Sequence, residues 1–70
     1  MDRQHVSSSD LKSMGYDKGS MTLEIEFNSG GIYQYSNVPE SVYMGLMGAA
    51  SKGTYFHQHI KENYRYRRIH

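Results

Sequence analysis

The fold of this chain is decided by the stretch MTLEIEFNSGGIYQY, residues 21–35. Leu23, Ile25 and Phe27 alternate with polar side chains, which is the pattern of a strand with one buried and one solvated face. The next residues, at 28–31, are Asn, Ser and two Gly, a composition typical of a hairpin turn. The stretch therefore predicts the centre of an antiparallel sheet.

The register of this hairpin determines where two tyrosines point. Residues 32–35 are expected to return antiparallel to the first strand. If the loop spans residues 28–30, Tyr33 lies opposite Ile25 and faces the core, and Tyr35 shares that face. A loop one residue longer or shorter would turn both tyrosines outward. Two alternatives follow: a stacking platform on an exposed sheet face, or core residues packed beneath helices, which the simplest register favours.

The residues before this hairpin predict a further strand and a polar lead-in. Apolar side chains over residues 11–16 suggest a strand, and a turn follows at residues 17–20. Residues 1–9 form a polar N-terminal arm, which is expected to be irregular or to pair along an edge of the sheet.

A first helix is expected after the sheet. Pro39 suits a first helical position, because its fixed φ is helical and it has no N–H to leave unpaired. Val42 and Leu46 lie four residues apart and begin a stripe that faces the core. Gly45 and Gly48 lie inside this helix and are expected to permit close backbone packing on the sheet.

A second helix and a final extended segment complete the chain. Ser51 can cap a helix from about residue 54 to residue 62, and residues 64–69 alternate Tyr and Arg as an extended segment. The sequence therefore predicts an α+β domain in which a three- to four-stranded antiparallel β-meander is followed by two helices packed on one face. A single domain is expected over residues 1–70, ending in a basic C-terminal segment, residues 64–70.

The total charge of +1 conceals a basic end. Residues 1–50 carry three basic and six acidic side chains, whereas residues 51–70 carry five basic and one acidic. Arginine offers a planar fork of donors and tyrosine a stacking face, so their mixture suits a partner with phosphates and bases. The candidate nucleic-acid-binding residues are Lys52, Lys61, Tyr64, Arg65, Tyr66, Arg67 and Arg68. An equally weighted alternative is a solvated edge strand whose charges discourage aggregation.

Other functional classes find little support in the sequence. There is no cysteine for a thiolate nucleophile or zinc ligand, and His57 and His59 would not share a helix face. Glu24 and Glu26 are expected on the solvated face of a sheet. No catalytic residue, metal or cofactor is predicted, and an enzyme is not expected. The sequence shows no membrane span and no secretory signal, so a cytoplasmic location is expected.

An ordered set of short motifs is more specific than any one of them. The set comprises Ser8-Ser9, Gly15-Tyr16-Asp17, Leu23-Glu24-Ile25-Glu26-Phe27, Gly31-Ile32-Tyr33-Gln34-Tyr35, Val38-Pro39, Tyr43, Leu46, Ala49, Ser51-Lys52-Gly53, Tyr55-Phe56, Ile60 and Tyr66-Arg67-Arg68. With this set the chain resembles the KTSC domain family, whose hallmark is the Tyr-x-Tyr pair formed here by Tyr33 and Tyr35. The resemblance extends from about residue 5 onward and implies the α+β fold.

The resemblance also suggests a function, by analogy. The family takes its name from the C-terminus of some lysyl-tRNA synthetases and also occurs as free-standing small bacterial proteins, and RNA binding is the role suggested by that attachment. We therefore expect a non-catalytic domain that binds RNA, either tRNA or another structured or single-stranded RNA. The alternative is a protein-interaction or structural module, self-associating in its simplest form, that uses an exposed strand edge and a helix carrying Met44 and Met47. Convergence of the basic side chains on one surface would favour the first hypothesis.

Overall fold

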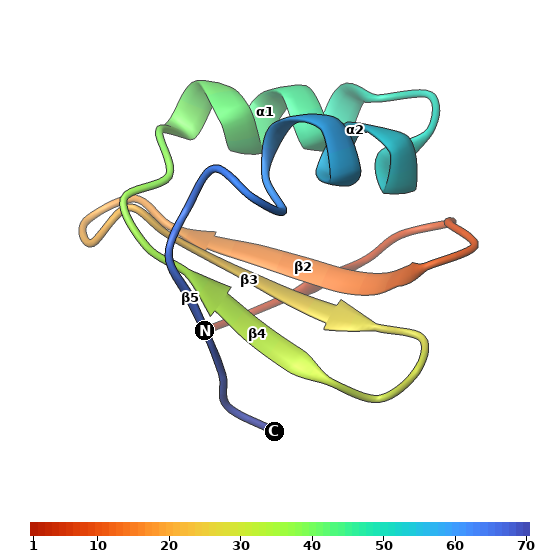
Figure 1. Cartoon of the computed structure of the whole chain (residues 1–70), viewed down its shortest axis with the longest axis horizontal. Helices are drawn as coiled ribbons and strands as arrows, with labels where there is room; N and C mark the ends of the chain where they lie inside the picture. The colour runs from red at the N-terminus through yellow and green to blue at the C-terminus, as the bar shows by residue number, and fades with distance from the viewer.

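The computed structural model describes residues 1–70, which form an antiparallel sheet of five strands and two helices. Figure 1 shows that both helices lie on the same face of the sheet. The strands lie in the sheet in the order in which they occur in the chain. The elements are β1 (Gln4–His5), β2 (Leu11–Asp17), β3 (Thr22–Phe27), β4 (Ile32–Tyr35), α1 (Glu40–Gly48), α2 (Lys52–His59) and β5 (Tyr66–Arg68). The predicted α+β architecture is confirmed, although the sheet has five strands, because the polar arm contributes β1 and the basic segment contributes β5.

The predicted hairpin register is confirmed. Ile25 lies opposite Tyr33, and Leu23 lies opposite Tyr35. The loop closes through a hydrogen bond of 2.9 Å from the Gly30 N–H to the Phe27 carbonyl, and Gly30 has a φ of 105°, a conformation that glycine adopts without steric cost. Both tyrosines of the Tyr-x-Tyr pair therefore lie on the face that the helices cover.

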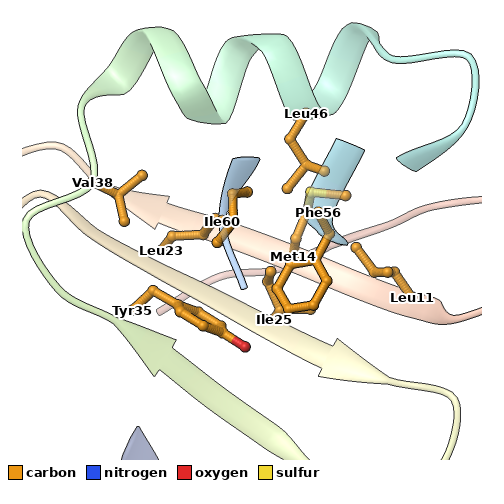
Figure 2. Packing of buried hydrophobic residues seen from close by; sticks show 9 residues of the cluster. All are labelled: Leu11, Met14, Leu23, Ile25, Tyr35, Val38, Leu46, Phe56 and Ile60. Atoms are coloured by element: carbon orange, nitrogen blue, oxygen red, sulfur yellow. The ribbon is translucent and has the colours of Figure 1, made fainter. Parts of the chain in front are cut away.

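The core lies between this face and the two helices (Figure 2). It consists of Leu11, Met14, Leu23, Ile25, Tyr35, Val38, Leu46, Phe56 and Ile60. Leu46 is the one fully buried side chain of α1. The predicted core stripe of this helix is thus narrow, because Val42 is only partly buried. A nine-residue helix with one buried anchor depends on its neighbours for stability.

The helix boundaries are close to the predicted ones. Pro39 directly precedes α1, and its carbonyl accepts a hydrogen bond of 3.0 Å from the Val42 N–H. Helix α2 begins two residues earlier than predicted, at Lys52, and ends at His59. Ser51 caps it as predicted, because its Oγ accepts a hydrogen bond of 3.3 Å from the Thr54 N–H.

Close packing at Gly45 differs from the prediction. A Cβ atom at Gly45 would meet the ring of Tyr55 on α2, and a Cβ atom at Gly48 would meet nothing within 4 Å. Neither glycine brings α1 close to the sheet. Gly45 instead accommodates the helix–helix contact, and the prediction of close packing on the sheet was wrong.

The outer face of the sheet also departs from expectation, because Glu24 is buried rather than solvated. Its side chain is 5% exposed and forms an ion pair with Arg3 from the N-terminal arm. Gln34 on β4 donates a hydrogen bond of 2.9 Å to the other carboxylate oxygen. Burial by itself would raise the pKa of Glu24, but the hydrogen bonds from Gln34 and Arg3, with the Arg3 charge, hold the pKa below its ordinary value.

Candidate nucleic-acid interface

An open groove of about 900 Å³ lies on the helix side of the sheet, beside α2. Its floor and walls carry six aromatic side chains, namely Phe27, Tyr33, Tyr35, Phe56, Tyr64 and Tyr66. Polar residues complete the lining, among them Asp10, Asn28, His57, Lys61 and Glu62. We call this site the aromatic groove. Its volume lies within the range of typical ligand sites.

Strand pairing brings the tyrosines of the groove together. Tyr35 on β4 lies opposite Tyr66 on β5, and Tyr33 lies opposite Arg68. Because side chains alternate between the faces of a strand, these four residues share the helix side of the sheet. The ring centroid of Tyr66 lies 5.6 Å from that of Tyr33 and 5.6 Å from that of Tyr35. These separations are typical of interacting aromatic pairs.

Exposure increases from the core toward the edge of this cluster. Tyr35 is 4% exposed and lies at the margin of the buried cluster in Figure 2. Tyr33 is half-buried, and Tyr66 is 59% exposed. The core interpretation thus holds for Tyr35, while Tyr33 and Tyr66 offer surface to a ligand. Burial raises the pKa of Tyr35, with further contributions from Tyr33 and Tyr66, so its hydroxyl stays protonated and remains a donor.

The two adjacent arginines of β5 lie on opposite faces of the sheet. On the outer face, Arg67 donates a hydrogen bond of 3.3 Å to the Gln34 side-chain oxygen. On the groove side, the guanidinium carbon of Arg68 lies 5.8 Å from the centroid of the Tyr33 ring, within cation–π range. The Nε of Arg68 donates a hydrogen bond of 2.9 Å to the His70 carbonyl. The sheet therefore divides the basic C-terminal segment between two surfaces.

The remaining candidate residues are also divided. Lys61 and Tyr64 line the aromatic groove together with Tyr66. Lys52 lines a separate, polar hollow of about 350 Å³, and its Nζ donates a hydrogen bond of 3.2 Å to the Ala49 carbonyl. Arg65 is exposed at the entry to β5. The five basic side chains of residues 51–70 do not converge on one surface, and the groove itself also carries acidic residues. The charge distribution therefore does not favour the nucleic-acid hypothesis in the way a single basic surface would have done.

Several groove residues were not predicted from the sequence as part of a site. Phe27 was predicted only to lie on the buried face of its strand, and its ring packs edge to face against that of Phe56 with centroids 5.3 Å apart. Asp10 and His57 are brought together only by folding, with 3.9 Å between the His57 Nε2 and an Asp10 carboxylate oxygen. The regular spacing of apolar residues around each phenylalanine indicates that its ring is at least partly buried. No local pattern connects Asp10 to His57.

The histidines of α2 lie in different surroundings. His57 lies near Asp10, whereas the His59 ring packs on the ring of Tyr55 with centroids 4.5 Å apart. No group of three His, Asp or Glu side chains lies close enough together to hold a metal ion. Neither helix is long and apolar enough to cross a membrane.

The predicted methionine surface is smaller than expected. Met47 packs against the core, and Met44 is 60% exposed. The adaptable apolar surface expected from both side chains is thus reduced to Met44.

Comparison with known proteins identifies relatives of two kinds. An uncharacterised protein of Stutzerimonas stutzeri is 46% identical over 70 residues, covering 99% of each chain. A lysine–tRNA ligase of a Nostoc species is 43% identical over 59 residues, which are 84% of this chain but 10% of the ligase. The chain thus matches a small part of the ligase and the whole of the shorter relative.

A solved structure and a family model agree with each other. The crystal structure of a KTSC domain protein from Yersinia pestis superposes with a TM-score of 0.96 at 45% sequence identity, covering 99% of this chain and 97% of the other. The sequence model of the KTSC domain matches residues 7–64. The fold, the ordered motifs and these matches together establish that the chain belongs to the KTSC domain family.

Proposed function

We propose that this KTSC domain binds single-stranded RNA, or an unpaired segment of a structured RNA, in the aromatic groove. The observation that carries the proposal is the grouping of Tyr33, Tyr66 and Arg68 on the helix side of the sheet, at its β5 edge. Exposed aromatic rings stack with bases, and cations beside them neutralise phosphates. Unpaired bases are needed, because those within an RNA duplex cannot reach such a surface.

Each part of the groove has a separate role in this proposal. Tyr66 is the most exposed ring and supplies the stacking surface, which is worth about 1–3 kcal/mol per base. Phosphates are contacted by Lys61, which lines the groove, and by Arg68, whose guanidinium lies over the neighbouring Tyr33 ring. Two phosphate contacts give weak, salt-sensitive binding rather than tight sequence-specific recognition.

The family relationship supports RNA as the partner. Lysine–tRNA ligases contain a segment similar to this chain. Such a segment, attached to an enzyme that acts on tRNA, is suited to a supporting contact with RNA, and we carry this role to the present chain as part of the proposal.

The test is fluorescence anisotropy of short RNA oligomers at ~50 and ~200 mM salt, a range in which phosphate contacts change affinity strongly. Arg68→Gln and Arg67→Gln form a matched pair, because both remove one charge from neighbouring positions on opposite faces. We expect Arg68→Gln to reduce the slope of log K against log salt by about 0.7, the value for one phosphate contact with a single strand. We expect Arg67→Gln to leave the slope unchanged.

Two results would refute the proposal. One is the absence of RNA binding at the lower salt concentration. The other is an equal effect of both arginine substitutions, which would indicate a general charge effect instead of a groove contact. A Tyr66→Ala variant provides an independent measure, because it removes the stacking surface without changing the charge.

A second candidate function rests on the position of β5. This strand forms one edge of the sheet, and all three of its residues are exposed. An exposed edge can accept a strand from another chain, including a second copy of this one. Sedimentation over a range of concentrations tests self-association, and a monomer at all of them would exclude that version.

A further inference from the structure

We propose that Asp10 selects the ligand of the aromatic groove by accepting a hydrogen bond from a donor group on the RNA. The inference rests on the proposed function and specifies the chemistry of the ligand. The groove proposed to bind phosphates includes the carboxylate of Asp10. That carboxylate would repel a phosphate and weaken binding unless it makes a favourable contact of its own.

The main chain of Asp10 is held by hydrogen bonds, whereas its carboxylate is not. The Asp10 carbonyl accepts a hydrogen bond of 2.8 Å from the Asn28 N–H, and the Asp10 N–H donates one of 3.3 Å to the Ser8 Oγ. The carboxylate accepts no hydrogen bond within the protein, and its side chain is 56% exposed. The His57 Nε2, 3.9 Å away, is too distant for a hydrogen bond. An acceptor is therefore held at the groove and available to a ligand.

Nucleic acids carry two kinds of group that could donate a hydrogen bond to this carboxylate. One is the ribose 2′-hydroxyl, which distinguishes RNA from DNA. The other is a base N–H group, such as the amino group of guanine. An ionised carboxylate forms strong, short hydrogen bonds with either. Asp10 lines the groove together with the aromatic rings, so a ligand that fills the groove meets this carboxylate.

Asp10 also has a structural role to be separated from selection. A Cβ atom at Gly53 would lie 3.0 Å from an Asp10 carboxylate oxygen, so the carboxylate lies against the first turn of α2. A negative charge there favours the helix through its dipole. This role affects the stability of the fold and is measured by thermal unfolding, whereas selection is measured by ratios of affinities.

The experiment compares three oligomers: a uridine oligomer with a central guanine, the same RNA with inosine in that position, and the deoxyribose form of the first. Asp10→Ala removes the acceptor, and Asp2→Ala is the matched control, because Asp2 is an exposed carboxylate that does not line the groove. Melting curves confirm that both variants are folded. We expect the unaltered protein to bind the oligomer that carries the donor about tenfold more tightly than the oligomer that lacks it, the difference expected for one hydrogen bond to a charged group. Asp10→Ala should abolish this preference.

The pattern of loss identifies the donor. Loss of the RNA-over-DNA preference assigns it to the ribose, and loss of the guanine-over-inosine preference assigns it to the base. The inference is overturned if folded Asp10→Ala keeps both preferences, if Asp2→Ala changes them equally, or if the protein binds all three oligomers with one affinity. Failure of the protein to bind any of them would instead reject the proposed function itself, and the inference with it.

Discussion

The two glycines of α1 provide a direct test of how the helices pack. A methyl group at Gly45 would lie 2.8 Å from the Tyr55 Cζ atom and closer still to its hydroxyl oxygen, whereas a methyl group at Gly48 would meet nothing within 4 Å. Gly45→Ala and Gly48→Ala therefore make the same chemical change on one helix, in one crowded and one open position.

The expected magnitudes follow from two opposing effects. Alanine is favoured over glycine inside a helix by about 1 kcal/mol. Against this, the Tyr55 ring must move, at a cost of about 1–3 kcal/mol for an overpacked contact. We therefore expect Gly45→Ala to lower the free energy of unfolding by about 0–2 kcal/mol, from the difference of these terms. Gly48→Ala, at the last residue of the helix, should raise it by up to about 1 kcal/mol.

Thermal unfolding followed by circular dichroism measures this difference. For a chain of this size, 1 kcal/mol changes Tm by about 4–8 °C. The assignment of the cost to Tyr55 is tested by repeating Gly45→Ala in a Tyr55→Phe background, where the loss of the hydroxyl should relieve part of the destabilisation. The reasoning is refuted if Gly45→Ala is as stable as Gly48→Ala, or if the Tyr55→Phe background makes no difference.

Three further predictions concern the N-terminal arm and two titrating groups. Gly15→Ala should displace the N-terminal arm, because a Cβ atom at position 15 would lie 3.2 Å from the Asp2 carbonyl carbon and closer still to the carbonyl oxygen. The rate of amide hydrogen exchange should therefore rise in β1 but not in β4. Because the pKa of Glu24 is lower in the folded chain than in the unfolded chain, its ionised carboxylate stabilises the fold at neutral pH. This contribution is lost as the pH falls below about 4.3, the ordinary pKa of a glutamate, and the carboxylate becomes protonated. Chemical denaturation should therefore show Glu24→Gln less stable than the wild type at pH 7 but equally stable in acid, and a constant difference would contradict the assignment. The raised pKa of Tyr35 predicts a loss of stability above about pH 10 that Tyr35→Phe should reduce, as measured by denaturation over that range.

The central hairpin was predictable because the residues that determine it lie next to one another in the sequence. Alternation around Ile25 and the composition of the loop indicate both strands. Their register depended on the length of the loop, and the structure has the pairing that the simplest loop gives. The Ser51 cap was predictable for the same reason.

Features that depend on distant residues were not predictable. The burial of Glu24 requires Arg3 to reach it from an arm that carries no strong strand pattern. The separation of Arg67 from Arg68 follows from strand alternation, but only once β5 is known to pair with β4. The contact of Asp10 with His57 has no counterpart in any local motif, so the polar side of the groove became visible only in the structure.

The position of β5 also has a consequence for folding. Strands β1 to β4 pair with their neighbours in sequence, whereas β5 joins β4 only after both helices have been traversed. Contacts between segments far apart in the chain are slow to form, because a long loop must close first. We therefore expect Tyr66 and Arg68 to dock late along the folding pathway, so that the surface proposed to bind RNA matures after the hydrophobic collapse of the first four strands. Stopped-flow refolding that monitors both an RNA-binding signal and secondary structure would then show binding competence lagging behind strand formation.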